Sequence, residues 1–210
     1  MTAAQARKQL IAVMRRTLVL GLNTGTAGNA SLRAGRDFLV TPSGVSYGRM
    51  TPGDIVTVTT TGETRGKRKP SSEWCLHAAI LAARPEFSAV LHTHAPHVAA
   101  LSTLRKGIPA FHYMVAVAGG ADIRCAPYAT FGTKKLADNA VTALAGRSAC
   151  LLANHGMIAC GRSLDEALDL ALEVENLTRQ YLLALAAGAP RNLSATEMAR
   201  VLKKFTTYKS

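Results

Sequence analysis

The chain has 210 residues, of which 48% are hydrophobic and 18% charged, and this length and composition predict one globular domain over residues 1–210. No apolar run approaches the roughly 18 residues of a membrane helix, and the N-terminus lacks the apolar segment of a secretion signal. We therefore expect a cytoplasmic protein without a membrane partner. The net charge of +12 suits phosphorylated small molecules, and because the basic residues are scattered and accompany no nucleic-acid-binding motif, we expect no nucleic-acid partner.

Hydrophobic periodicity and turn residues predict the elements in chain order. Helices are expected at 3–20, ended by Gly21, at 72–84, capped by Ser71 or Ser72, and at 96–107, 133–147, 163–188 and in the tail from 194. Strands are expected at 38–44, 55–61 and 87–96, with a hairpin at 149–161 that turns at 154–156. Residues 21–33 read as a glycine-rich turn, and 108–114 and 125–132 as short extended pieces. This order favours a three-layer α/β or α+β fold.

The four cysteines form no C-x-x-C pair and no dense framework. We therefore expect reduced, mostly buried thiols, as in an intracellular protein.

Histidines provide the strongest chemical signal. His92 and His94 are two residues apart on a predicted strand, so their side chains point to the same side. His155 lies in the predicted turn after an apolar strand and could reach the same place. Three neutral imidazoles suit Zn²⁺ and leave one coordination position open. A pair of hydrogen-bonded structural histidines at 92 and 94 is an equally simple interpretation.

The remaining histidines are expected to have structural roles. His77 shares a helix face with Glu73 and is interpreted as a hydrogen-bonded core or interface histidine. His97 and His112 are interpreted as packing residues or as residues that support the site from outside it.

Three segments could bind an anion. Ser71 and Ser72 stand at the start of a predicted helix, where N–H groups are unpaired, although a plain helix cap explains them as well. The segments 28–31 and 41–44 bring glycine and small polar residues that can cradle an anion, or can simply be turns.

Considered together, the motifs are more specific. GLNTGTAGNASLR, LVTPSGV, KPSSEW, HTHAPH, HYM, GG, CAPYATFGT and NHG occur in an order and spacing that resemble the class II aldolase and adducin family. The resemblance extends from about Leu18 to Tyr208. It implies an α/β fold of three αβα layers, with a central, mostly antiparallel sheet flanked by helices and a mobile C-terminal arm at about 194–210.

The resemblance also implies roles for individual residues. It assigns His92, His94, His155 and Glu73 to one Zn²⁺ or another divalent ion per subunit, and Glu73 and Tyr113 to catalysis. It assigns Gly28, Asn29, Ser43, Gly44, Ser71 and Ser72 to phosphate binding, and Phe131 and Tyr208 to the aldehyde side. It implies a homotetramer whose active sites lie between subunits, with Tyr113 coming from a neighbour.

The implied activity is metal-dependent cleavage of a 1-phospho-ketose, foremost L-fuculose 1-phosphate, into dihydroxyacetone phosphate and an aldehyde such as L-lactaldehyde. A 5-deoxyribulose or 5-methylthioribulose 1-phosphate aldolase differs only in the aldehyde half. An L-ribulose-5-phosphate 4-epimerase and a methylthioribulose-1-phosphate dehydratase remain as alternatives on the same scaffold. A structural, adducin-like module is disfavoured because the three histidines and Glu73 are intact.

Overall fold

The computed structural model describes residues 2–208, which contain one eight-stranded sheet of order β4-β3-β2-β1-β5-β8-β7-β6. Neighbouring strands are antiparallel except for the parallel pair β6 and β7. The strands are β1 Asn29–Ala34, β2 Asp37–Val40, β3 Val56–Val58, β4 Thr64–Arg65, β5 Ala89–Thr93, β6 Cys125–Ala126, β7 Ala149–Leu152 and β8 Gly156–Gly161.

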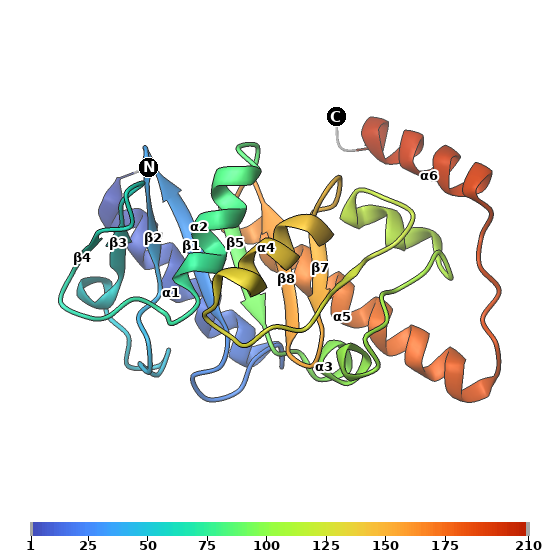
Figure 1. Cartoon of the computed structure of the whole chain (residues 1–210), viewed down its shortest axis with the longest axis horizontal. Helices are drawn as coiled ribbons and strands as arrows, with labels where there is room; N and C mark the ends of the chain where they lie inside the picture. The colour runs from blue at the N-terminus through green and yellow to red at the C-terminus, as the bar shows by residue number, and fades with distance from the viewer. Residues whose placement is uncertain (1, 209–210) are drawn as a thin grey trace.

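Helices cover both faces of the sheet (Figure 1). One face carries α1 Ala3–Val19, α3 Pro96–Thr103 and α5 Leu164–Ala187, and the other carries α2 Trp74–Ala83 and α4 Lys134–Ala143. Two short 3₁₀ helices are η1 Pro52–Asp54 and η2 Tyr113–Ala118, and α6 Ala195–Tyr208 lies at one end of the molecule. The predicted three-layer αβα fold is confirmed.

The central strands are buried on both faces. In β5, Leu91 packs into the core under α1 and α5, whereas Val90 and His92 point to the side of α2 and α4. In β8 the same alternation separates Met157 from Ile158. Each face therefore has its own apolar core, and the side of α2 also receives the polar residues of the strand ends.

Several predicted boundaries are wrong. The segment 21–33 was expected to be a turn, but its second half forms β1, a central strand. The strand expected at 55–61 is reduced to Val56–Val58, because Thr59 donates its N–H to Glu63 O and starts a turn. The HYM segment was expected to be extended, but it opens η2.

The start of α2 also differs from the prediction. Neither Ser71 nor Ser72 is the N-cap; Glu73 takes that position, with φ −102° and ψ 13°, and its side chain makes no cap hydrogen bond. The Ser71 hydroxyl instead accepts the N–H of Glu73 in the turn before the helix. The Glu73 carboxylate is thereby left to interact with groups on the sheet.

The remaining element predictions largely agree with the structure. α1 ends before Gly21, whose φ of +69° is the left-handed conformation of a helix terminus. Ser163 caps α5 by accepting the N–H of Glu166. All four cysteines are free, with Cys150 and Cys160 buried. Within residues 2–208, none of the helices combines the length and apolarity needed to cross a bilayer.

Candidate functional site

Three histidine rings meet at the ends of β5 and β7. His92 lies on β5, His94 directly follows that strand, and His155 lies in the turn between β7 and β8. Their ring centroids are 4.7 to 4.9 Å apart, and one nitrogen from each ring lies within 4.8 Å of the others. His92 Nδ1 lies 2.9 Å from Met157 O, and because a carbonyl only accepts, Nδ1 donates and Nε2 faces the other rings.

Glu73 brings a carboxylate to the histidines from the N-terminal end of α2. The residue is 6% exposed, with Oε2 3.2 Å from His92 Nε2 and Oε1 3.6 Å from His155 Nε2. Among residues 2–208, Oε1 finds no hydrogen-bond partner, although it is buried. The imidazole nitrogens and the carboxylate oxygens, all electron-pair donors, thus face one another around a common point. A divalent cation satisfies such an arrangement, so the residues fit a metal site.

The protonation states agree with metal binding. Burial lowers the pKa of His94 and of His155 to about 4, and the nearby His92 acts in the same direction. Burial opposes ionisation of Glu73, but the nearby imidazoles of His92 and His155 and the amide of Asn29 outweigh it and hold the pKa of this carboxyl far below its usual value. Neutral imidazoles and an ionised carboxylate are the forms that bind metals.

A buried chain of hydrogen bonds lies behind the carboxylate. Asn29 Nδ2 donates to Glu73 Oε2 over 3.0 Å, and Asn29 Oδ1 faces His77 Nε2 at 2.5 Å. The other nitrogen of His77 lies 2.7 Å from the Ser31 hydroxyl. Burial lowers the pKa of His77 to about 3, so its ring is neutral. The expected core histidine is therefore connected to the site through one side chain.

A cleft of about 370 Å³ opens beside the histidines. Glu73, His94 and His155 line it. The structure also brings together there all six residues that the family resemblance assigned to phosphate: Gly28, Asn29, Ser43, Gly44, Ser71 and Ser72.

The loop before β1 is fixed tightly against the histidines. The buried hydroxyl of Tyr47 reaches the carbonyl oxygens of Ala27 and Gly28 at 3.0 and 2.5 Å. Gly28 has φ +78°, and a Cβ there would lie 2.5 Å from Asn23 Nδ2 and 2.6 Å from His92 O. Only glycine allows this approach of the loop to β5.

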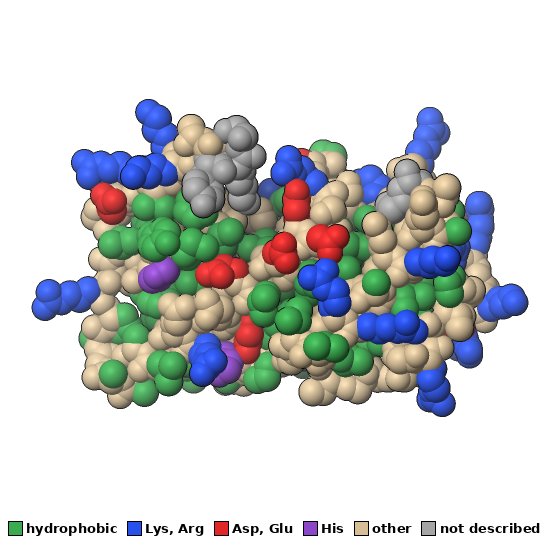
Figure 2. Space-filling model, turned by 180° about the vertical axis from the view of Figure 1, so that it is seen from behind, with side chains coloured by type: hydrophobic (Ala, Val, Ile, Leu, Met, Phe, Trp, Pro, Cys, Tyr) green, Lys and Arg blue, Asp and Glu red, His purple; other side chains and the backbone are tan. Residues whose placement is uncertain are grey.

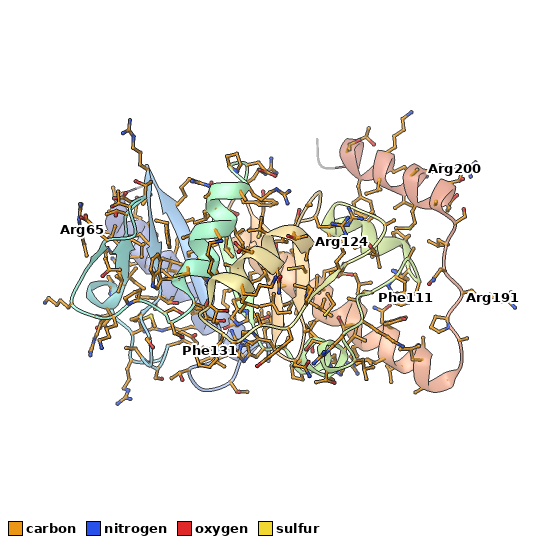
Figure 3. All side chains as sticks on the ribbon, in the orientation of Figure 1. Arg65, Phe111, Arg124, Phe131, Arg191 and Arg200 are labelled. Atoms are coloured by element: carbon orange, nitrogen blue, oxygen red, sulfur yellow. The ribbon has the colours of Figure 1, made fainter. Side chains whose placement is uncertain are left out.

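The aromatic residues assigned to the site do not all meet in one chain. Phe131 lines the cleft and is 64% exposed. Tyr113, 50% exposed, lines a different groove of about 970 Å³ between η2 and α6, together with Phe111. Figure 3 shows Phe111 on the side of the molecule that carries α6, and Phe131 well away from it, below α2. The side chain of Tyr208 lies outside what the structure describes.

The end of the molecule that bears α6 is partly apolar. Hydrophobic side chains gather there on the rear face, as Figure 2 shows. Met198 of α6 is buried in the core against η2, and Val201 and Phe205 line the groove. The mobility expected for this arm stays a prediction.

The structure adds residues that the sequence did not single out. Thr26, Tyr128 and Asn154 line the cleft. The buried Asn23 accepts the N–H of His94, and Ser102 Oγ of α3 accepts the N–H of His155. Nothing in their spacing distinguishes Asn23 and Ser102 from other polar residues near helix ends.

His97 and His112 lie apart from the three rings, as predicted for structural histidines. His97 Nδ1 is 2.6 Å from Glu175, and His112 Nδ1 accepts the N–H of Met114 at the start of η2.

Comparison with known proteins points in one direction. The family described as Class II Aldolase and Adducin N-terminal domain matches residues 8–182. A 5-methylthioribulose-1-phosphate/5-deoxyribulose-1-phosphate aldolase of Rhodospirillum rubrum is 56% identical over 202 residues, which cover 96% of this chain and 91% of the relative. An L-fuculose phosphate aldolase of Escherichia coli is 48% identical, covering 96% and 94%. A solved L-fuculose 1-phosphate aldolase superposes with a TM-score of 0.94 at 38% identity, covering 98% of both chains.

The histidine cluster generates a prediction about metal content. His92→Ala removes one of the three converging imidazoles, so zinc-loaded protein should lose nearly all bound metal in elemental analysis. His97→Ala is the matched control, because His97 pairs with Glu175 instead of the cluster, and it should retain one zinc per chain. Stoichiometric zinc in His92→Ala would contradict the assignment.

The loop before β1 generates a prediction about stability. Gly28→Ala should destabilise the fold by roughly 1–3 kcal/mol more than Gly25→Ala, because it adds overpacking against Asn23 and His92. Gly25, with φ +59°, carries the same backbone strain but has open space for a Cβ. Urea denaturation of both variants measures the difference, and equal losses would show that the close approach costs nothing.

Proposed function

The chain belongs to the class II aldolase and adducin family, and we propose that this aldolase cleaves a ketose 1-phosphate into dihydroxyacetone phosphate and a short aldehyde. One observation carries the proposal. A cleft large enough for a small sugar phosphate joins a metal-binding cluster to a set of glycines and hydroxyl side chains suited to phosphate.

The candidate substrates differ only in the aldehyde half. We place 5-deoxyribulose 1-phosphate and 5-methylthioribulose 1-phosphate first, because the relative named for them is 56% identical to this chain. L-fuculose 1-phosphate, the substrate favoured by the sequence motifs, is second and is supported by relatives at 48% identity and by the 0.94 TM-score.

The phosphate is proposed to bind among the glycines and hydroxyls of the cleft. Ser72 is exposed at the turn before α2, where it can donate to a phosphate oxygen. The side-chain amide of Asn29 is already bonded to Glu73 and His77, so Asn29 is proposed to contribute its backbone. The net charge of +12 helps to attract the dianion.

His92, His94, His155 and Glu73 are proposed to hold one divalent ion, with Zn²⁺ suited to three imidazoles. When bound, the ion supplies Lewis-acid polarisation of the ketose oxygens. When the C3–C4 bond breaks, its electron pair stays on C3. Glu73 lies beside the cluster and is proposed to move the proton that C3 gains.

The aldehyde forms when the C4 hydroxyl loses its proton, and a phenol is suited to exchange it. We assign this step to Tyr113. In its own chain this residue lines the groove beside α6, so it is proposed to reach the cleft of a neighbouring subunit in a homotetramer.

Product analysis tests the reaction. The metal-loaded protein is given 5-deoxyribulose 1-phosphate, 5-methylthioribulose 1-phosphate, L-fuculose 1-phosphate and L-ribulose 5-phosphate, and dihydroxyacetone phosphate is measured with a coupled dehydrogenase. We expect release from the 1-phosphates, fastest for the first two, and none after Glu73→Gln. Loss of water without dihydroxyacetone phosphate would identify a dehydratase, and inversion at C4 of L-ribulose 5-phosphate an epimerase.

Subunit mixing tests the origin of Tyr113. Tyr113→Phe should slow ketose cleavage by roughly 10²-fold, a usual size for a general acid–base contribution, while dihydroxyacetone phosphate still exchanges its C3 proton with solvent. Glu73→Gln should abolish that exchange. Mixing the two variants should give more activity than either variant alone, because some sites in hybrids combine an intact Glu73 with an intact Tyr113. No recovery despite demonstrated subunit exchange would mean that each site is built by one chain.

A further inference from the structure

We propose that His77 is a positioning residue that fixes the Asn29 amide and, through it, the orientation of the Glu73 carboxylate. The inference rests on the proposed function for its consequence in catalysis, but the hydrogen-bond arrangement itself stands on the contacts below.

The sheet and α2 bring the members of the chain together. Asn29 lies opposite His92 in the pairing of β1 with β5, and Ser31 follows on the same face of β1. His77 of α2 is one helical turn after Glu73, the N-cap of that helix, so both side chains face that side of the sheet. All four members of the chain are buried, so each polar atom needs a partner within the protein.

The ionised carboxylate sets the direction of every bond. A carboxylate only accepts, so Asn29 must present its NH₂ group to Glu73 Oε2 and its carbonyl Oδ1 to His77. His77 Nε2 must then carry the proton that it donates to Oδ1. The neutral ring therefore has an acceptor at Nδ1, which receives the Ser31 hydroxyl. Any member turned around would place two acceptors or two donors face to face.

This one-way chain fixes the orientation of both Glu73 oxygens. Asn29 occupies Oε2, and Oε1 is left without a hydrogen bond, 3.6 Å from His155 Nε2. Oε2 also lies 3.2 Å from His92 Nε2, so both oxygens face the cluster, and His77 acts by fixing the rotation of the carboxylate through Asn29. Without the donor at Nε2, Asn29 Oδ1 would be buried and unpaired, and no hydrogen bond would hold the amide in its present orientation.

Two substitutions at position 77 separate positioning from packing. His77→Leu fills space but donates nothing, and should lower kcat for dihydroxyacetone phosphate release by about 10- to 100-fold, as for other residues that orient a metal ligand. KM should change little, because Asn29 is proposed to bind phosphate through its backbone and the other phosphate residues form no hydrogen bond with His77. His77→Gln supplies an N–H near the place of Nε2 and should recover most of kcat. Ile80→Ala, one turn further along α2 and fully buried, is the matched control, and should lower stability without lowering kcat.

A spectroscopic measurement can test the direction of these hydrogen bonds without metal or substrate. In ¹⁵N-histidine NMR of the metal-free protein, the resonance lost in His77→Gln should have a protonated Nε2 and an unprotonated Nδ1. It should stay constant through the pH range where an ordinary histidine titrates. A protonated Nδ1, or titration in that range, would overturn the arrangement even if His77→Leu failed to fold.

The kinetic and spectroscopic results have distinct meanings. Wild-type kcat in His77→Leu, or a loss in His77→Gln as large as in His77→Leu, would overturn the positioning role. If the wild-type protein releases dihydroxyacetone phosphate from none of the ketose phosphates, the proposed function fails, while the NMR result still decides the tautomer of His77.

Discussion

The buried carboxylate of Glu73 is the constraint on which the rest of the site depends. An ionised carboxylate that is 6% exposed is stable only if its surroundings supply donors or cations. The amide of Asn29 supplies one donor, and the three converging imidazoles create the place for a cation. Because Asn29 and His92 are paired across β1 and β5, the sheet register delivers both groups to the same carboxylate. A slip by one residue would turn them to opposite faces.

Where local pattern and tertiary role agree, the fold could be predicted from the sequence. The amphipathic spacing of 3–20 and 163–188 correctly predicted α1 and α5. The apolar run around His92 correctly predicted β5. The histidine spacing also predicted the cluster, because residues two apart on a strand share a face. His77 could be placed on the face of Glu73 by the same reasoning, although its contact with Asn29 depends on β1, which local pattern did not reveal.

The wrong predictions of β1 and of the α2 cap have one physical origin. β1 was interpreted as a turn because Asn29 and Ser31, which look solvent-exposed in the sequence, are buried under α2 and satisfied by Glu73 and His77. The alternating pattern that predicts a strand depends on apolar side chains. It does not detect buried polar side chains that are hydrogen-bonded inside the protein. The cap of α2 was misassigned for a related reason, since Ser71 bonds the turn before the helix. The polar residues of the site thus made β1 and the start of α2 difficult to predict from the sequence.

Under the proposed function, the two halves of a ketose phosphate meet different residues of this cleft. The proposed phosphate residues come from one chain and are fixed by backbone contacts, including those of Tyr47 to the loop at Gly28. The cleft is also lined by Tyr128 and Phe131, which are 54% and 64% exposed, so their rings are accessible to a ligand. The candidate substrates share the dihydroxyacetone phosphate half and differ in the aldehyde. Under the proposed function, a change of aldehyde therefore requires no change in the histidines, in Glu73 or in the phosphate residues. This separation explains how relatives named for different sugar phosphates can be so similar to one chain.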